Sequence, residues 1–420
     1  MRTRNLIKSY LLFAFIVMFT IQAYSQHKSL LKEGTWLGVI TRADSNKIQF
    51  NFTSSSLTGK QVVNIINGDE NLLVDDIAKV DDSILLTLPF FNASLLVKAV
   101  SPNHLQGYYI KKQNDKSSRI PFDAYWGVRE RFPNAIKGKY SANGTWDVEF
   151  IGRNNTINKA VGSFVQNKQG KVTGSFLTPT GDYRFLEGIV SGDTLKLSGF
   201  DGGFASYFEA KFINDSTIID GKYFSGATAT TLWTAQKNDT IQLPDEYGYS
   251  KIRVGEEGKL NFKFKDTDGK LVSISDDRYK NKVVIVQILG SWCPNCMDET
   301  SFLSKFYNEN KNRGIEIIGL AYERTEDFEQ SKKLLAIYQK RFNVKYPFLI
   351  TGVTPSDPQR VEKTLPQIDK IAAFPTSIFV DKKGLVRKIH TGYDGPGTGK
   401  FYEKFKTEFN ELINQLLSEQ

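Results

Sequence analysis

The chain has 420 residues, of which 40% are hydrophobic and 24% are charged, as is typical of globular proteins. This length predicts two or three domains, and the composition excludes a wholly disordered chain. The net charge of +9 comes without any basic run that resembles a nucleic-acid-binding stripe. We therefore expect no nucleic acid among the partners.

Residues 1–25 have the pattern of a secretory signal peptide. Three basic residues in the first eight positions precede an apolar stretch over 11–21, and Ala23 and Ser25 supply the small residues of a cleavage site. The apolar stretch is about half the roughly 20 residues that a membrane-spanning helix needs. We expect export to the periplasm or cell envelope, an oxidising compartment. The alternative is an uncleaved N-terminal membrane anchor.

The chain has two cysteines, Cys293 and Cys296, and they form one CxxC motif. A fold held together by several disulfides is therefore excluded, and so is a zinc site built from the thiolates of one chain, since four ligands are usual. The three histidines are scattered, and no histidine follows Cys296 as haem attachment requires. We expect neither a metal nor a cofactor, and we expect the two thiols to do redox work.

Residues 26–238 are expected to form a β-rich domain of unknown role. Short runs of alternating polar and apolar residues, such as 47–52, are separated by frequent turn signals, which predicts an antiparallel barrel or sandwich. The tripeptide Gly-Thr-Trp occurs at 34–36 and again at 144–146, through either an internal duplication or chance. The carboxylates of this domain are spread over turns, and we expect each to be a solvated turn former.

Residues 239–258 are polar and turn-rich and are expected to form a linker. From 259 to 420, strands and helices alternate, which predicts an α/β domain with a thioredoxin-like fold. On the helix predicted over 326–341, four apolar side chains are expected to face the core: Leu334, Leu335, Ile337 and Tyr338. The other predicted elements are a hairpin within 260–274, strands at 282–289, 315–321, 376–380 and 385–390, and helices at 294–310 and 400–417.

The CxxC motif stands where a buried strand runs directly into a helix. This places Cys293 at the helix N-terminus, where free N–H groups and the helix dipole favour the thiolate that attacks disulfides. Cys296 lies one turn on, along the same face, where it can resolve the mixed disulfide. Pro294 suits the first helical turn, because the N–H that it lacks would have no partner there. The alternatives are a half zinc site completed by another chain and an inert local disulfide.

Three motifs resemble the TlpA/ResA group of exported, thioredoxin-like thiol–disulfide oxidoreductases: KVVIVQILGSWCPNC at 282–296, IEIIGLAY at 315–322 and AAFPTSIFVDKKGLV at 372–386. The resemblance covers residues 255–420. It implies a role in reducing disulfides of exported proteins, such as apocytochrome c, and a membrane thiol-reducing electron donor. It assigns the attacking thiol to Cys293 and the resolving thiol to Cys296, which would form the redox disulfide.

The resemblance also implies supporting residues around the two thiols. Pro375 falls on the cis-proline of the family, which packs against the disulfide. Glu299 matches an acidic residue that could accept the proton of Cys296, and a surface glutamate is the alternative. Trp292 is expected to shield the thiols, with packing alone as the alternative. Gln287 stands where ordinary thioredoxins carry a buried aspartate, so Glu299 or water must take over that task.

The leading prediction is therefore an exported enzyme that reduces disulfides of partner proteins. The alternative is a binding protein whose β-rich domain captures a ligand, with oxidase, isomerase or peroxidase-type activity secondary. A thioredoxin-fold peroxidase would need a proline and a threonine that do not precede Cys293 at the required spacing. The choice between reductase and oxidase depends on the stability of the reduced cysteine pair, which the sequence does not give.

Overall fold

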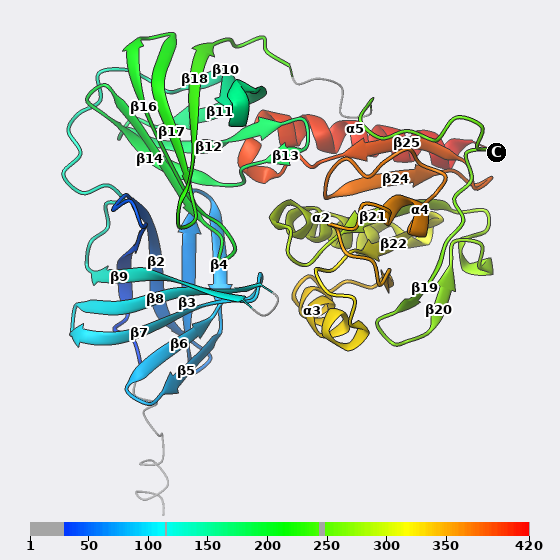
Figure 1. Ribbon diagram of the computed structural model, residues 1–420, viewed down its shortest axis with the longest axis horizontal. Coiled ribbons are helices and arrows are strands. Elements are labelled where there is room, and N and C mark those ends of the chain that lie inside the picture. Colours follow the sequence, from blue (N-terminus) through cyan, green and yellow to red (C-terminus); the bar gives the residue numbers. More distant parts are fainter. Residues whose placement is uncertain (1–28, 114–115, 243–247, 420) are drawn as a thin grey trace, which may run out of the picture.

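A computed structural model describes residues 29–113, 116–242 and 248–419. Figure 1 shows two β-rich bodies beside an α/β body, so the predicted fold class, antiparallel all-β followed by a thioredoxin-like α/β fold, is confirmed. The predicted signal peptide lies outside the described residues. In the part of the chain that the structure describes, no helix combines the length and hydropathy required to cross a membrane.

The first sheet is an antiparallel meander with the spatial order β4-β3-β2-β1-β9-β8-β7-β6-β5. Strand β1 therefore pairs with both β2 and β9, and β4 and β5 form the two edges of the sheet. Alternating residues place Trp36, Phe50 and Phe122 in the core. The strands are β1 (Gly34–Thr41), β2 (Lys47–Leu57), β3 (Lys60–Asn67), β4 (Glu70–Val74), β5 (Asp76–Val80), β6 (Ser83–Thr87), β7 (Ala93–Ser101), β8 (His104–Gln113) and β9 (Lys116–Trp126).

The second sheet has the order β11-β10-β18-β17-β16-β15-β14-β12-β13 and closes into a barrel, because β11 also pairs with β12. Aromatic rings fill its interior, and the rings of Phe176 and Phe208 lie 4.6 Å apart. The strands are β10 (Gly144–Ile151), β11 (Ile157–Gln166), β12 (Lys171–Thr178), β13 (Gly181–Asp182), β14 (Leu186–Ser191), β15 (Thr194–Phe200), β16 (Ala205–Asn214), β17 (Thr217–Ser225) and β18 (Ala229–Lys237).

The two β sheets have the same local arrangement around the recurring Gly-Thr-Trp tripeptide. This similarity favours an internal duplication over chance as the origin of the tripeptide. In each sheet the first strand pairs with the second and the last. The indole N–H of Trp36 donates to the carbonyl oxygen of Lys32 at 2.9 Å, and that of Trp146 donates to Ala142 at the same distance. Each tryptophan thus anchors the chain four residues before it.

The two β sheets pack against each other through buried contacts. The ring of Phe50 stacks on that of Phe200 at 4.4 Å, and the side-chain amide of Asn67 exchanges two hydrogen bonds with the backbone of Phe200. The buried guanidinium group of Arg131 donates to the carbonyl oxygens of Ser198 and Ile66. These contacts join the two sheets over residues 34–237 into one packed body.

The third sheet has seven strands in the order β20-β19-β23-β22-β21-β24-β25. All seven residues of β21 are buried, as its continuous apolar run predicts. Strand β22 runs parallel to β21 and β23, whereas β24 runs antiparallel to β21. The strands are β19 (Lys263–Asp266), β20 (Leu271–Ser273), β21 (Val283–Leu289), β22 (Ile315–Ala321), β23 (Phe348–Ile350), β24 (Thr376–Val380) and β25 (Val386–Thr391).

Four helices accompany the third sheet: α2 (Pro294–Asn310), α3 (Phe328–Arg341), α4 (Arg360–Thr364) and α5 (Lys400–Ser418). Strand β23 and helix α4 were not predicted, because three and five residues are too few to show periodicity. Two of the four core positions predicted on α3 are wrong. Leu335 and Tyr338 are buried, but Ile337 is 43% exposed and Leu334 is partly exposed. Helix α3 turns only a narrow face to the sheet, and these two side chains face a cleft instead.

The α/β body contacts the β sheets directly. Phe90, in the connection between β6 and β7, packs its ring against Tyr338 at 5.2 Å and Phe342 at 5.5 Å. The guanidinium group of Arg341 donates to the carbonyl oxygen of Leu73 at 2.6 Å. The end of the predicted linker also packs on the α/β body, because Ile252 forms a β-bridge with Ile368. The domain boundaries at 238 and 259 stay a prediction.

Candidate active site

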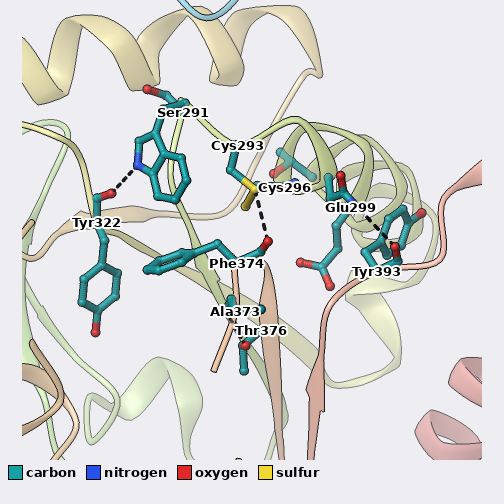
Figure 2. Close-up of a disulfide and its surroundings, with 12 residues drawn as sticks. Ser291, Cys293, Cys296, Glu299, Tyr322, Ala373, Phe374, Thr376 and Tyr393 are labelled. Carbon is teal, nitrogen blue, oxygen red and sulfur yellow. Dashed lines mark hydrogen bonds between the residues drawn. A yellow bond between two sulfur atoms is a disulfide. The ribbon is translucent and has the colours of Figure 1, made fainter. Parts of the chain in front are cut away.

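Cys293 and Cys296 form a disulfide at the start of α2 (Figure 2). Cys293 is the N-cap residue of the helix, and its Sγ accepts the backbone N–H of Cys296 at 3.2 Å. Pro294 follows in the first turn, as predicted. The helix therefore directs its free N–H groups at the sulfur of Cys293, which stabilises negative charge there once the disulfide is reduced.

The Phe374–Pro375 peptide bond is cis and lies beside the disulfide. The carbonyl oxygen of Phe374 is 3.3 Å from Sγ of Cys293, and Figure 2 shows the two facing each other. This proximity follows from the sheet, because β24 begins directly after Pro375 and pairs with β21, the strand that leads to Cys293. The backbone N–H of Gly392 donates to the carbonyl oxygen of Pro375 at 2.9 Å and holds the turn.

Trp292 packs next to the disulfide. Its indole N–H donates to the carbonyl oxygen of Tyr322 at 2.8 Å, and its ring meets the ring of Phe374 edge-on at 5.2 Å. A Cβ atom on Gly290 would lie 2.2 Å from the indole nitrogen of Trp292, so only glycine at position 290 leaves room for this ring. The guanidinium group of Arg324 lies over the indole ring, 4.7 Å from its centre.

Glu299 is buried one turn beyond Cys296, so the alternative of a surface glutamate is wrong. Its carboxylate accepts hydrogen bonds from the Gln287 amide at 2.8 Å and from the Ser377 hydroxyl at 3.0 Å. Burial raises the pKa of Glu299 to about 7, even though these two hydrogen bonds and the nearby His390 lower it. A carboxyl group with this pKa can exchange protons near neutral pH.

Gln287, which stands where ordinary thioredoxins carry an aspartate, is fully buried on β21. Its amide nitrogen donates to Glu299 and also lies 3.1 Å from the hydroxyl oxygen of Thr300. The side chain of Gln287 therefore orients the carboxylate of Glu299 and does not titrate itself. In this chain the ionisable group near the cysteines is therefore the carboxyl group of Glu299 on α2, whereas ordinary thioredoxins have it on the strand.

Glu323, a buried residue that supports the turn before the cysteines, was not predicted from the sequence. Its carboxylate accepts the backbone N–H of Ser291 at 2.8 Å and the hydroxyl of Ser291 at 2.6 Å. Burial raises the pKa of Glu323, against the effect of these hydrogen bonds. A signal was available, since Glu323 closely follows the parallel strand β22 and functional groups gather at the carboxyl ends of such strands.

The β12–β13 hairpin, residues 178–182, reaches from the second sheet to the active site. The side-chain amide of Asn295, between the two cysteines, donates to the carbonyl oxygen of Asp182 at 3.2 Å. The carboxylate of Asp182 accepts the backbone N–H of Gly395 at 2.6 Å. Burial raises the pKa of Asp182 to about 7, and the nearby carboxylate of Asp298 adds to this effect. The hairpin therefore contacts both sides of the redox site.

Arg184 links the two β sheets to helix α2 next to this hairpin. Its buried guanidinium group pairs with Glu70 of the first sheet, with Asp201 of the second at 3.1 Å and with Asp298 of α2 at 2.7 Å. The expectation that the carboxylates of the β half are solvated is wrong for Glu70 and Asp201, whose side chains are about nine-tenths buried. No local pattern predicts this cluster, because Glu70 and Asp298 each lie 114 residues from Arg184.

The disulfide is enclosed in this arrangement. Cys293 is 4% exposed, and Cys296 is completely buried. The structure brings together every residue that the sequence analysis proposed for the site: Trp292, Cys293, Pro294, Cys296, Glu299 and Pro375. Gln287, noted from the sequence, lies beside Glu299, and the structure adds Glu323, Arg324 and the hairpin, which arrive through tertiary contacts.

Residues 253–404 match the family model described as Redoxin. Thiol-disulfide oxidoreductase ResA of Halalkalibacterium halodurans is 28% identical over 166 residues, which cover 39% of this chain and 79% of that protein. ResA of Bacillus cereus is 29% identical over 140 residues, covering 33% of this chain and 70% of that protein. A solved thiol:disulfide interchange protein of Chlorobium tepidum is 22% identical with a TM-score of 0.30, covering 38% of this chain and 96% of that one. The C-terminal region is therefore a Redoxin domain.

Proposed function

We propose that this chain, whose C-terminal region is that of a thiol–disulfide oxidoreductase, reduces disulfides of exported partner proteins. The observation that carries the proposal is the Cys293–Cys296 disulfide at the N-terminus of α2, one turn from the buried carboxyl group of Glu299. Such a site can hold a thiolate at its outer sulfur and a proton acceptor near its inner one.

In the proposed reaction, the thiolate of Cys293 attacks one sulfur of the partner disulfide. The partner S–S bond breaks, its second sulfur leaves as a thiolate, and a mixed disulfide forms. Glu299 takes the proton of Cys296, and the Cys296 thiolate then attacks Cys293. The partner leaves as a dithiol that has gained two electrons, and the enzyme is left with the Cys293–Cys296 disulfide. A membrane dithiol donor must then reduce the enzyme again.

The other site residues have supporting roles in this proposal. Pro294 starts the helix that stabilises the Cys293 thiolate, and Pro375 with Phe374 provides a backbone edge against which a partner strand can lie. Trp292 covers the disulfide from one side. The ResA proteins are thiol–disulfide oxidoreductases by name, and the basic, apolar N-terminal segment agrees with export, cleaved or retained as an anchor. Disulfide-bearing exported proteins, such as apocytochrome c, are the proposed substrates.

Cysteine variants test the roles of the two thiols. Cys296→Ser should form a stable mixed disulfide with an oxidised protein substrate, because nothing resolves it, whereas Cys293→Ser should form none and reduce nothing. Non-reducing gel electrophoresis with mass spectrometry detects the trapped complex. A Cys293→Ser protein that still reduces disulfides, or that traps the partner, would show that the nucleophile is misassigned.

The reduction potential of the Cys293–Cys296 couple tests the direction of the reaction. We expect a value near the roughly −270 mV of thioredoxin, measured by equilibration against dithiothreitol and glutathione buffers. A value near the roughly −120 mV of strongly oxidising periplasmic enzymes would mean that the protein forms disulfides instead. That outcome would support the oxidase alternative.

A further inference from the structure

A cleft of about 320 Å³ opens between the first sheet and the Redoxin domain, beside the redox disulfide. One wall comes from residues 87–93 and from β8, and the other comes from Ser291 and Trp292, from residues 323–325 and from α3. The cleft thus ends at the residue directly before Cys293. Neither the β half nor the Redoxin domain forms this cleft alone.

The walls of the cleft are largely apolar. Phe90 and Phe91 contribute from the first sheet, and Trp292 contributes from the Redoxin domain. Leu334 and Ile337 of α3 line it as well, which explains why the sequence pattern placed them wrongly in the core. Exposed apolar side chains in a concave site favour contact with a ligand that carries apolar groups of its own.

The charges on the cleft are predominantly positive. Its cationic side chains are Lys111, Lys112, Arg324 and Lys333. The carboxylate among its lining residues, Glu323, is 3% exposed and already accepts two hydrogen bonds from Ser291. The cleft therefore attracts a ligand with negative charge.

Arg324 is the cation best placed to meet such a ligand. It lies over the indole ring of Trp292 and, in the part of the chain that the structure describes, donates to no carboxylate, although the charge of the neighbouring Glu323 opposes the effect of burial on its pKa. The ammonium group of Lys111 stands on the opposite wall, where it donates to the carbonyl oxygen of Gly203. Burial lowers the pKa of both cations, so an incoming carboxylate would stabilise their charged forms.

We propose that this cleft binds the partner polypeptide through a segment that carries Asp or Glu next to its reactive cysteine, and that Arg324, assisted by Lys111, pairs with this carboxylate. The inference rests on the proposed function and gives it a substrate preference. It also gives the first sheet a role, because this sheet supplies one wall of the cleft. Arg324 is then a specificity-determining residue two positions from Tyr322, which holds Trp292 against the disulfide.

Labelled peptides in which serine replaces cysteine separate recognition from redox chemistry. Three otherwise identical apolar peptides carry Glu, Gln or Lys beside the serine, and fluorescence anisotropy measures their binding to the full chain. We expect the Glu peptide to bind roughly 5- to 10-fold more tightly than the Gln peptide, because its carboxylate would form a charged hydrogen bond with Arg324 in a partly exposed site. The Lys peptide should bind most weakly.

Variants at Arg324 then identify the group responsible. Arg324→Gln should remove the preference for Glu, and Arg324→Glu should reverse it toward Lys, a gain that a misfolded variant cannot produce. Arg313→Gln is the matched control, because it removes the same charge just beyond the C-terminal end of α2 and should leave the preference intact. Equal binding of the Glu and Gln peptides to the unaltered protein, or no reversal in Arg324→Glu, would overturn the inference.

The corresponding cysteine-containing peptides, closed by a disulfide, show whether recognition serves reduction. We expect kcat/KM to follow the same order as binding, and to lose that order in Arg324→Gln. If the Glu peptide binds selectively but no peptide is reduced, the proposed function fails while the cleft assignment stands. If all peptides are reduced at one rate regardless of charge, the proposed function stands and the cleft assignment fails.

Discussion

At the level of single residues, the proposed proton acceptor of this site is a carboxyl group on a helix, held by an amide on a strand. Gln287 and Ser377 donate to Glu299, while burial raises the pKa of its carboxyl group to about 7. Below pH 7 the group is protonated and cannot accept a proton from Cys296. Above pH 7 it is ionised, so the resolving step should accelerate as the pH rises through about 7.

Glu299→Gln tests this acceptor, because glutamine keeps the shape of the side chain but cannot titrate. We expect resolution of the mixed disulfide to slow about 100-fold and to lose its rise near pH 7, as followed by stopped-flow kinetics between pH 5 and 9. The control is Glu309→Gln, the same change at an exposed position of α2. An unchanged pH profile in Glu299→Gln would assign the proton transfer to water.

The same substitution has a defined effect on stability. Because the pKa of Glu299 is higher in the folded protein than its usual 4.5, the unaltered protein loses stability as the pH rises from 4.5 to 7. Glu299→Gln lacks this loss. Relative to the unaltered protein, its free energy of unfolding should rise by about 3 kcal/mol over that pH interval, measured by urea denaturation. A constant difference between the two proteins would contradict the raised pKa.

At the scale of elements, the β12–β13 hairpin fits against the Redoxin domain because glycine leaves room on both sides. A Cβ atom on Gly392 would lie 2.7 Å from the carbonyl carbon of Thr180, and one on Gly181 would lie 2.6 Å from the Asn295 amide. Gly392 also has a φ of +83°, which other residues adopt at a cost. The hairpin and the active site therefore meet at positions where glycine allows the two chain segments to approach each other closely.

Gly392→Ala should displace the hairpin and expose the reduced Cys293. We expect alkylation of Cys293 by iodoacetamide to become several-fold faster, as measured by mass spectrometry. Gly384→Ala is the matched control, since Gly384 has nearly the same φ, +80°, but has no atom near the position of a Cβ. Gly181→Ala tests the contact from the hairpin side and should act in the same direction. Equal alkylation rates in all three variants would show that the hairpin does not cover the thiol.

At the level of the whole molecule, Arg184 links the first sheet, the second sheet and helix α2. Its guanidinium group neutralises carboxylates from each of them, and its pKa lies well above the ordinary value because these carboxylates outweigh the effect of burial. A buried charge that loses its partner is strongly destabilising. The contact of Phe90 with Tyr338 and Phe342 provides a second, apolar attachment.

Arg184→Met should lower the free energy of unfolding by about 3–5 kcal/mol, because it leaves Glu70, Asp201 and Asp298 without their shared cation. Urea denaturation followed by circular dichroism measures this loss. Arg387→Met is the control. Arg387 also pairs with two carboxylates, Asp381 and Glu419, but is one-third exposed, so its loss should cost at most about 1 kcal/mol. Equal losses in the two variants would show that the Arg184 cluster is not buried in solution.

The order of elements in the Redoxin domain and most residues of the redox site could be predicted from the amino-acid sequence. Strands β22 and β24 have the predicted bounds, and α2 begins at Pro294 as predicted. These features are local: a continuous apolar run becomes a buried strand, and a cysteine before a proline caps the helix that follows. The resemblance to a known family added Pro375 and Glu299, which no local pattern would have selected.

The surroundings of the disulfide, by contrast, result from contacts between distant segments of the chain. Arg184, Asp182 and the cleft residues of the first sheet lie more than 100 positions from the cysteines in sequence, and nothing in their neighbourhoods distinguishes them from ordinary turn residues. Ile337 looked like a core residue because helical periodicity marks an apolar face without saying what covers it. Local patterns fix strands and helices, whereas charge pairing and clefts arise from the packing of distant segments.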